Sequence, residues 1–315
     1  MSTSLAPPGP GPGAPAFRPA DLAELKANRP TTADWLWQGD LSAGNVTLLT
    51  SQWKAGKTTL TSVLLSKLGS GGTLAGLPVR PGRAVVVSEE ASALWVARGE
   101  RLAFGPNVRF LCRPFLGRPT PAGWRALIDH LLQQRWSDGL DLAVVDTLAS
   151  FLPTSGESNA GVMMDALLPL QALTAAGMSV LLNHHPRKGE PAAGQAARGS
   201  GALTGFVDIS VEMKWFGRPT DDDRRRTLAG YSRHADTPRR LVIELNAEGT
   251  DYASLGDFAA PELDAGWSVL VGVLEDASRK LTRQQIRDAW PADYPKPDDV
   301  SLWRWLDRLV SDGRV

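Results

Sequence analysis

The stretch that decides the fold is Asn45–Leu60, which reads NVTLLTSQWKAGKTTL. Its mainly apolar start, Val46–Leu49, is typical of a buried strand, and the polar segment Ser51–Gly56 that follows is typical of a loop. A helix is expected to open at Lys57, because leucines and a valine follow it at helical spacing. A strand, a loop and a helix joined at Gly-Lys-Thr predict a phosphate-binding loop.

The chemistry of such a loop follows from its geometry. Backbone N–H groups at the helix start point at the phosphates, and the helix dipole favours negative charge there. We expect Lys57 to reach the β- and γ-phosphates of ATP and the Thr58 hydroxyl to bind Mg²⁺. The other residues expected to bind the nucleotide are Ser51, Gln52, Trp53, Lys54, Ala55, Gly56 and Thr59.

One position departs from the motif G-x-x-x-x-G-K-[ST], because Ser51 stands where the first glycine is expected. That glycine mainly eases the turn out of the strand. Gly56, Lys57 and Thr58 carry the phosphate contacts, so we expect the change to be tolerated. The competing interpretation is an ordinary strand, turn and helix with a chance Gly-Lys-Thr.

Bulk composition describes an ordinary globular protein, since 43% of the 315 residues are hydrophobic, 22% are charged and the formal net charge is zero. No global positive field therefore favours nucleic acid. The single cysteine, Cys112, excludes an internal disulfide and a multi-cysteine metal site, and its strand-like surroundings predict a small buried residue. No apolar run reaches transmembrane length and no signal pattern opens the chain, so we expect a cytoplasmic protein without a membrane partner.

Domain organisation is indicated by shifts in composition. Residues 1–20 are rich in Pro, Gly and Ala and predict a disordered leader. Residues 21–258 are expected to form one α/β ATPase domain. Residues 262–315 predict three short helices that resemble a winged helix-turn-helix with its wing truncated. That segment has eight basic and ten acidic residues, which does not favour DNA, so a packing or protein-binding role is an equal alternative.

Carboxylates follow two further buried strands of this domain. The strand Arg83–Ser88 runs into Glu89 and Glu90, at the edge where ligands bind in open α/β sheets. One of them is expected to deprotonate the attacking water, with Glu89 preferred, while the other favours the start of the next helix. Asp146 ends another apolar strand and is expected to organise Mg²⁺.

A fourth buried strand, Met178–Asn183, is followed by His184 and His185. We expect one histidine to sense the γ-phosphate, since two adjacent histidines without a third ligand make a poor zinc site. The loop Pro186–Gly205 carries Arg187, Lys188 and Arg198. It would contact a nucleic-acid backbone, or it is simply a solvated loop.

The rest of the domain is read from periodicity and turn residues. Antiparallel strands are expected at Asp208–Trp215, Arg225–Arg233 and Leu241–Leu245, extending a parallel sheet. Helices are expected at Asp21–Asn28, Ala91–Leu102, Pro121–Arg135 and Ala160–Ala176, with a turn at Gly69–Gly72 and a polar loop at Ser150–Asn159.

The set of motifs resembles the RecA-like P-loop ATPases, and within them the RepA-type hexameric replicative helicases often labelled AAA family ATPases. The matching segments are WLWQGDLSAGNVTLLTSQWKAGKTTL, VVVSEE, LAVVDTL, LLNHHPRKG followed by RGSGALTG, and YSRHADTPRRLVIELNAEGTDY. Together they span Trp35–Tyr252.

The resemblance implies roles for individual residues. Glu89 or Glu90 is implied as the catalytic base, Asp146 as the strand aspartate, and His184 or His185 as the sensor. It further places Arg198–Ser200 near DNA and makes Arg233 an arginine finger acting on a neighbouring subunit. A ring, with a hexamer as the family's form, and single-stranded DNA as a partner are implied in the same way.

The sequence therefore predicts a Mg²⁺-dependent RecA-like ATPase coupled to DNA translocation or unwinding. The alternatives are a recombination or repair ATPase like RecA or RadA, and an ATP-dependent switch that acts through protein partners. A small-molecule kinase is disfavoured by the glutamate that follows the second strand.

Overall fold

A computed structural model gives the fold of the chain, which divides into two units, Met1–Asp34 and Trp35–Val315. The structure describes residues 19–27, 33–52, 54–153, 159–185, 201–216, 223–256 and 265–311. The described part of the first unit holds the helix α1 (Leu22–Ala27), none of whose residues is buried. Nearly all of the predicted leader lies outside the described residues.

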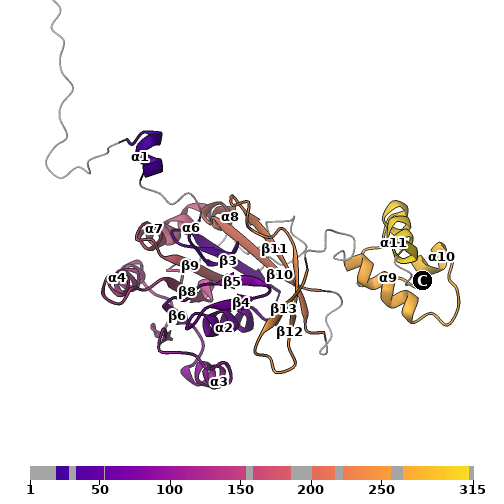
Figure 1. Cartoon of the computed structure of the whole chain (residues 1–315), viewed down its shortest axis with the longest axis horizontal. Coiled ribbons are helices and arrows are strands. Elements are labelled where there is room, and N and C mark those ends of the chain that lie inside the picture. Colours follow the sequence, from indigo (N-terminus) through magenta and orange to yellow (C-terminus); the bar gives the residue numbers. More distant parts are fainter. Residues whose placement is uncertain are drawn as a thin grey trace, which may run out of the picture. The chain divides into compact units, whose positions relative to one another are not determined.

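The second unit is built on one large sheet (Figure 1). Its strands are β3 (Val46–Ser51), β6 (Ala84–Ser88), β7 (Val108–Cys112), β8 (Leu142–Asp146), β9 (Ser179–His184), β10 (Ile209–Trp215), β11 (Arg225–Ser232), β12 (Leu241–Leu245) and β13 (Tyr252–Gly256). The nine strands lie in the order β13-β12-β11-β10-β3-β9-β8-β6-β7. The strands from β10 to β7 run parallel, and β11 to β13 continue the sheet in antiparallel fashion, which confirms the predicted α/β fold.

The strand register brings the polar strand ends together. Thr50 on β3 pairs with His184 on β9, Asn183 on β9 pairs with Asp146 on β8, and Asp146 pairs with Ser88 on β6. These four of the parallel strands, β3, β9, β8 and β6, therefore end at one edge, called the carboxyl edge below. The opposite end of the same strands is called the amino edge.

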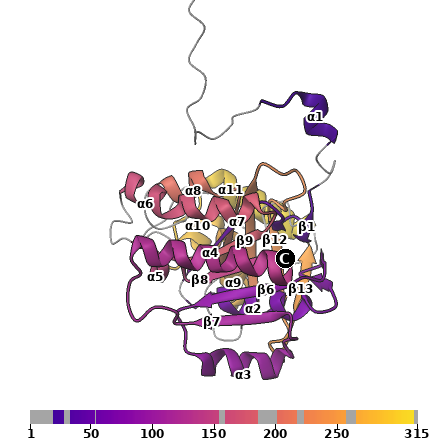
Figure 2. The ribbon, with the colours of Figure 1, turned by 90° about the vertical axis from the view of Figure 1, so that its left-hand side faces the viewer.

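Helices cover both faces of the sheet (Figures 1 and 2). One face, called the P-loop face below, carries α2 (Lys57–Lys67) and α3 (Ser92–Leu102). The opposite face carries α4 (Pro121–Asp138), α5 (Leu148–Phe151), α6 (Ala160–Leu167), α7 (Gln171–Ala175) and α8 (Gly201–Phe206). Strand residues alternate between the faces, so Leu49 and Leu181 pack with α2 while Leu48 and Leu182 pack with the other helices.

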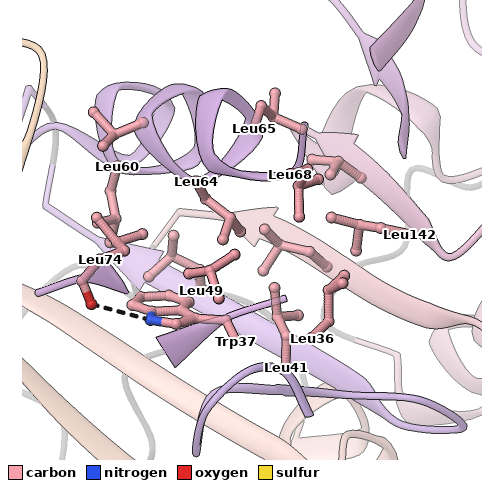
Figure 3. Packing of buried hydrophobic residues seen from close by; sticks show 14 of the residues in the cluster. Leu36, Trp37, Leu41, Leu49, Leu60, Leu64, Leu65, Leu68, Leu74 and Leu142 are labelled. Carbon is pink, nitrogen blue, oxygen red and sulfur yellow. Dashed lines mark hydrogen bonds between the residues drawn. The ribbon is translucent and has the colours of Figure 1, made fainter. Parts of the chain in front are cut away.

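A small second sheet closes the P-loop face and was not predicted. It consists of β1 (Trp35–Trp37), β2 (Leu41–Ser42), β4 (Gly72–Leu74) and β5 (Leu77–Val79) in the order β2-β1-β5-β4. Figure 3 shows Leu36, Trp37 and Leu41 packed with the leucines of α2. The Trp37 indole N–H donates to the Leu74 carbonyl, with a nitrogen-to-oxygen distance of 3.3 Å. Strands of two or three residues are too short to show a period in the sequence.

Three other predictions need correction. The loop predicted over Pro186–Gly205 runs into α8, because Leu203 is buried against the opposite-face core. The single helix predicted over Ala160–Ala176 is interrupted by a 3₁₀ turn that contains Pro169. The loop predicted from Ser150 begins later, since Ser150 belongs to α5.

Cys112 is partly rather than fully buried, because β7 is the edge strand of the large sheet.

The last described residues, 265–311, contain the helices α9 (Ala265–Glu275), α10 (Arg283–Asp288) and α11 (Asp299–Ser311). They share a core that includes Trp267, Trp290 and Trp305. Thr282 caps α10 in a capping box with Gln285. The winged-helix interpretation of this segment remains a prediction.

Candidate nucleotide site

The loop between β3 and α2 has the backbone expected of a phosphate-binding loop. Gly56 lies at the N-cap of α2 with φ 105°, a conformation that glycine adopts without strain. Lys54 is also left-handed, with φ 59°. The 11-residue helix then begins at Lys57, so its first-turn N–H groups face the loop as an anion site requires. Trp53 lies outside the described residues.

Ser51, the position that departs from the motif, belongs to β3 rather than to the turn. Its side chain is buried and accepts a hydrogen bond from Lys57, with Nζ 3.1 Å from Oγ. Lys57 Nζ also lies 3.4 Å from the Ser51 carbonyl. The serine therefore fits the loop without strain and gives the lysine a hydrogen-bond partner. Burial lowers the pKa of Lys57, an effect that Asp146 and Glu89 oppose.

Thr58 and Asp146 meet at the carboxyl edge. The Thr58 hydroxyl donates to Asp146 Oδ2 at 3.1 Å, although 88 residues separate them in the chain. Burial raises the pKa of Asp146, and hydrogen bonds from Asn183 and Thr58 oppose that rise. A hydroxyl and a carboxylate are hard oxygen donors of the kind Mg²⁺ takes in nucleotide sites, where water and phosphate complete its shell. These two residues fit such an ion.

The two candidate bases differ in their contacts. Glu90 is held by Arg98 of α3, whose Nη2 lies 3.0 Å from Oε1 and whose Nη1 contacts Oε2. Glu89 is exposed, and its Oε2 accepts a hydrogen bond from Ser150. The Glu89 backbone is fixed by its N–H, which donates to the Asp146 carbonyl at 2.9 Å. Glu89 is therefore held beside β8, and within the described residues no arginine pairs with its carboxylate.

The end of β9 separates its polar residues by face. Asn183 lies on the P-loop face, where its Nδ2 donates to Thr61 Oγ1 of α2 at 3.1 Å. His184 has the parity of Leu182 and so lies, fully buried, on the opposite face. His185 follows the end of the strand and is partly exposed. The predicted strand end at Asn183 is one residue too early, because β9 includes His184. Sequence reasoning assigned the sensor role to one of the two histidines and gave Asn183 no role in the site.

The P-loop is supported from behind by residues that sequence reasoning also missed. Arg226 on β11 donates from Nε to the Ala55 carbonyl at 2.7 Å, and its guanidinium lies 3.5 Å from the centre of the Trp215 ring. The Tyr252 hydroxyl and the Met213 methyl group pack against Gly56. A Cβ atom at position 56 would lie 3.4 Å from the hydroxyl oxygen and 3.6 Å from the methyl carbon. Their positions in late strands gave no local signal.

Arg233, the predicted finger, lies at the amino edge. It follows β11, which runs antiparallel to β10, and Ser232 pairs with Ile209 at the start of β10. The adjacent His234 hydrogen-bonds Asn45 through Nε2 at 3.0 Å and meets the Trp35 ring edge-on at 5.1 Å. Arg233 and the P-loop of one chain thus lie at opposite ends of the sheet.

The remaining predicted residues, Arg187, Lys188 and Arg198, lie outside the described residues. Within the described ranges, no three or more His, Cys, Asp or Glu side chains gather as a metal cluster. No helix in those ranges has the length and apolar character needed to cross a bilayer.

The parallel sheet, the glycine at the start of α2 and the Thr58–Asp146 pair define a P-loop ATPase fold. A family model described as AAA domain matches residues 13–191, more than half of the chain. The chain belongs to this AAA domain family. The matched region contains Lys57, Thr58, Glu89 and Asp146 and ends before β10. No curated protein matches the chain.

Proposed function

We propose that the chain is a Mg²⁺-dependent ATPase whose hydrolysis cycle drives movement along DNA, as in RepA-type replicative helicases. The observation that carries the ATPase part is the 3.1 Å hydrogen bond between Thr58 and Asp146, next to the buried Lys57. Residues of the helix α2 and the strand β8, far apart in the sequence, meet there, and this supports binding of a nucleotide phosphate and its cation.

The roles follow from the contacts of each residue. Lys57 and the first turn of α2 bind the phosphates, and Thr58 and Asp146 hold Mg²⁺, which when bound offsets the phosphate charge. Glu89 takes the proton of the attacking water, because in the part of the chain that the structure describes its carboxylate does not form an ion pair like the one between Glu90 and Arg98. His184 or His185 senses the γ-phosphate. His185 is favoured by strand parity, which turns His184 to the opposite face.

Assembly into a ring is proposed from the place of Arg233. A residue at the amino edge serves a second chain more readily than its own P-loop at the carboxyl edge. An arginine finger from a neighbouring subunit would complete each site, and a hexamer is the form that the family resemblance implies. The Trp35–His234–Asn45 contacts would hold the loop that carries this finger.

The DNA part rests on the sequence of the loop that follows His185. Arg187, Lys188 and Arg198 would contact the phosphate backbone of single-stranded DNA. A recombination or repair ATPase like RecA or RadA remains the second candidate, since it would use the same site, and a partner-binding switch is the third.

Steady-state ATP hydrolysis with and without single-stranded DNA tests the proposal. We expect turnover in the wild-type chain, stimulation by DNA, and loss of turnover in Lys57→Ala. Lys67→Ala is the matched control, because it removes a lysine at the other end of α2 that pairs with Asp251 at 2.6 Å.

Each result has a distinct meaning. Normal hydrolysis by Lys57→Ala would refute the nucleotide site. Turnover that DNA does not change would keep the ATPase and favour the switch that acts through proteins. Stable DNA-dependent filaments in place of rings would favour the recombination ATPase.

A further inference from the structure

Asn183 occupies a position between the two halves of the nucleotide site. On β9 it pairs in register with Asp146 on one side and with Leu49 of the P-loop strand on the other. It is fully buried and lies on the P-loop face. A side chain at this point can connect the metal-binding strand to the helix that carries Lys57 and Thr58.

The amide makes such a connection. Its Nδ2 lies 3.1 Å from Thr61 Oγ1, one turn of helix along α2 from Thr58. The Asn183 side chain also hydrogen-bonds the Asp146 carboxyl, which accepts from Thr58 at the same time. Asp146 is thus oriented by two side chains, and one of them is itself fixed to α2.

The carbonyl oxygen of the Asn183 side chain lowers the stability of the fold. Asn183 Oδ1 is buried and accepts no hydrogen bond from the described residues. A buried polar atom left unpaired lowers the stability of the fold, because it loses its hydrogen bonds to water. The preceding β9 residues Val180, Leu181 and Leu182 are apolar, and a leucine at 183 would avoid that cost. The amide is therefore better explained by the site than by stability.

We propose that Asn183 is a positioning residue that sets the orientation of the Asp146 carboxylate toward the bound cation. This inference rests on the proposed nucleotide site. It predicts that replacing Asn183 by an apolar residue keeps the stability of the fold but weakens the binding of nucleotide that depends on Mg²⁺. Replacing a residue that hydrogen-bonds a metal ligand typically lowers metal affinity by roughly 10- to 100-fold.

The test uses ADP binding to the full chain by calorimetry, once with Mg²⁺ and once with EDTA, together with thermal unfolding. The variant is Asn183→Leu combined with Thr61→Val, because removing both partners leaves no unpaired hydroxyl. We expect unfolding at the same or a higher temperature, unchanged affinity for metal-free ADP, and at least tenfold weaker binding of MgADP.

The matched control is Thr50→Val. Thr50 is equally buried, its Oγ1 also lacks a hydrogen bond within the described residues, and it lies on the opposite face of the adjacent strand. We expect this variant to keep the wild-type ratio of the two ADP affinities. Thr61→Val alone should fall between the control and the double variant, because the amide keeps its bond to Asp146.

Three results would overturn the inference. MgADP affinity in the double variant equal to wild type would show that the amide does not orient the carboxylate. Equal loss of both affinities with a lower unfolding temperature would assign Asn183 to the fold alone. A wild-type chain that binds no nucleotide would refute the proposed function, and this inference with it.

Discussion

The carboxyl and amino edges of the large sheet use their polar residues differently. At the carboxyl edge, Lys57 and Asp146 are buried beside the partly exposed Thr58, and burial displaces the pKa values of the lysine and the aspartate. At the amino edge, Asn45 and His234 join loops through a side-chain hydrogen bond near the surface. The first arrangement keeps charge in a desolvated place, where it can act strongly on a ligand, and the second fixes loop geometry.

The largest expected effect is that of replacing Arg233. It would break the division between the two edges, because it would give a residue of the amino edge a role in catalysis. Arg233→Ala is expected to lower kcat by roughly 10³-fold while nucleotide binding persists, since a finger stabilises charge that develops in the transition state. Mixing this variant with Lys57→Ala should restore part of the activity, because some sites then pair an intact P-loop with an intact finger. Hydrolysis assays of the mixture give the answer, and absence of rescue would speak against sites shared between subunits.

The next effect sharpens the comparison within the carboxyl edge. Glu89→Gln is expected to lower kcat by roughly 10²- to 10³-fold with little change in ADP affinity, as the loss of a general base does. Glu90→Gln is its matched neighbour and should mainly weaken the contact with Arg98, lowering stability by less than about 1 kcal/mol. A larger loss of kcat in Glu90→Gln than in Glu89→Gln would reverse the assignment.

The smallest effect concerns a buried carboxyl group near the amino edge. Asp40 lies in the turn before β2, its carbonyl accepts from Thr47 at 2.6 Å, and burial raises its pKa from 3.8 to about 7. Between these values the folded chain holds a proton that the unfolded chain has lost, so stability falls as pH rises and levels off above about 7.

Asp40→Asn should remove this part of the pH dependence. Between pH 5 and pH 8 the wild type should lose about 2–3 kcal/mol more stability than the variant. Urea unfolding at the two pH values measures the difference. Identical pH dependence in the two proteins would mean that Asp40 is ionised in the folded chain.

The sequence predicted the parts of the site that are local in the chain. The P-loop strand, Gly56 and Lys57 lie within a dozen residues, and Asp146 ends an apolar run, so composition and spacing were sufficient. The parallel sheet followed from apolar runs between helices, as strands buried on both faces require.

What the sequence could not predict depends on register and distant contacts. Arg226 and the P-loop carbonyl that it holds are 171 residues apart. Asn183 was passed over because the last residue of an apolar strand gives no sign of which face it occupies. The small sheet escaped because its strands are short and its hairpin turns at Ala75-Gly76, where Ala75 has the positive φ more typical of asparagine or aspartate.

The hydrogen bond between Lys57 and Ser51 has a consequence for nucleotide exchange. In the proposed site, a phosphate bound to Lys57 would compete with the Ser51 oxygens for the three N–H donors of the ammonium. When the nucleotide leaves, Ser51 can accept the same proton again, and the buried ammonium need not become unpaired during departure. If Lys57 binds phosphate as proposed, Ser51 would act as a competing partner within the chain, which would lower the affinity of the loop for nucleotide and favour product release.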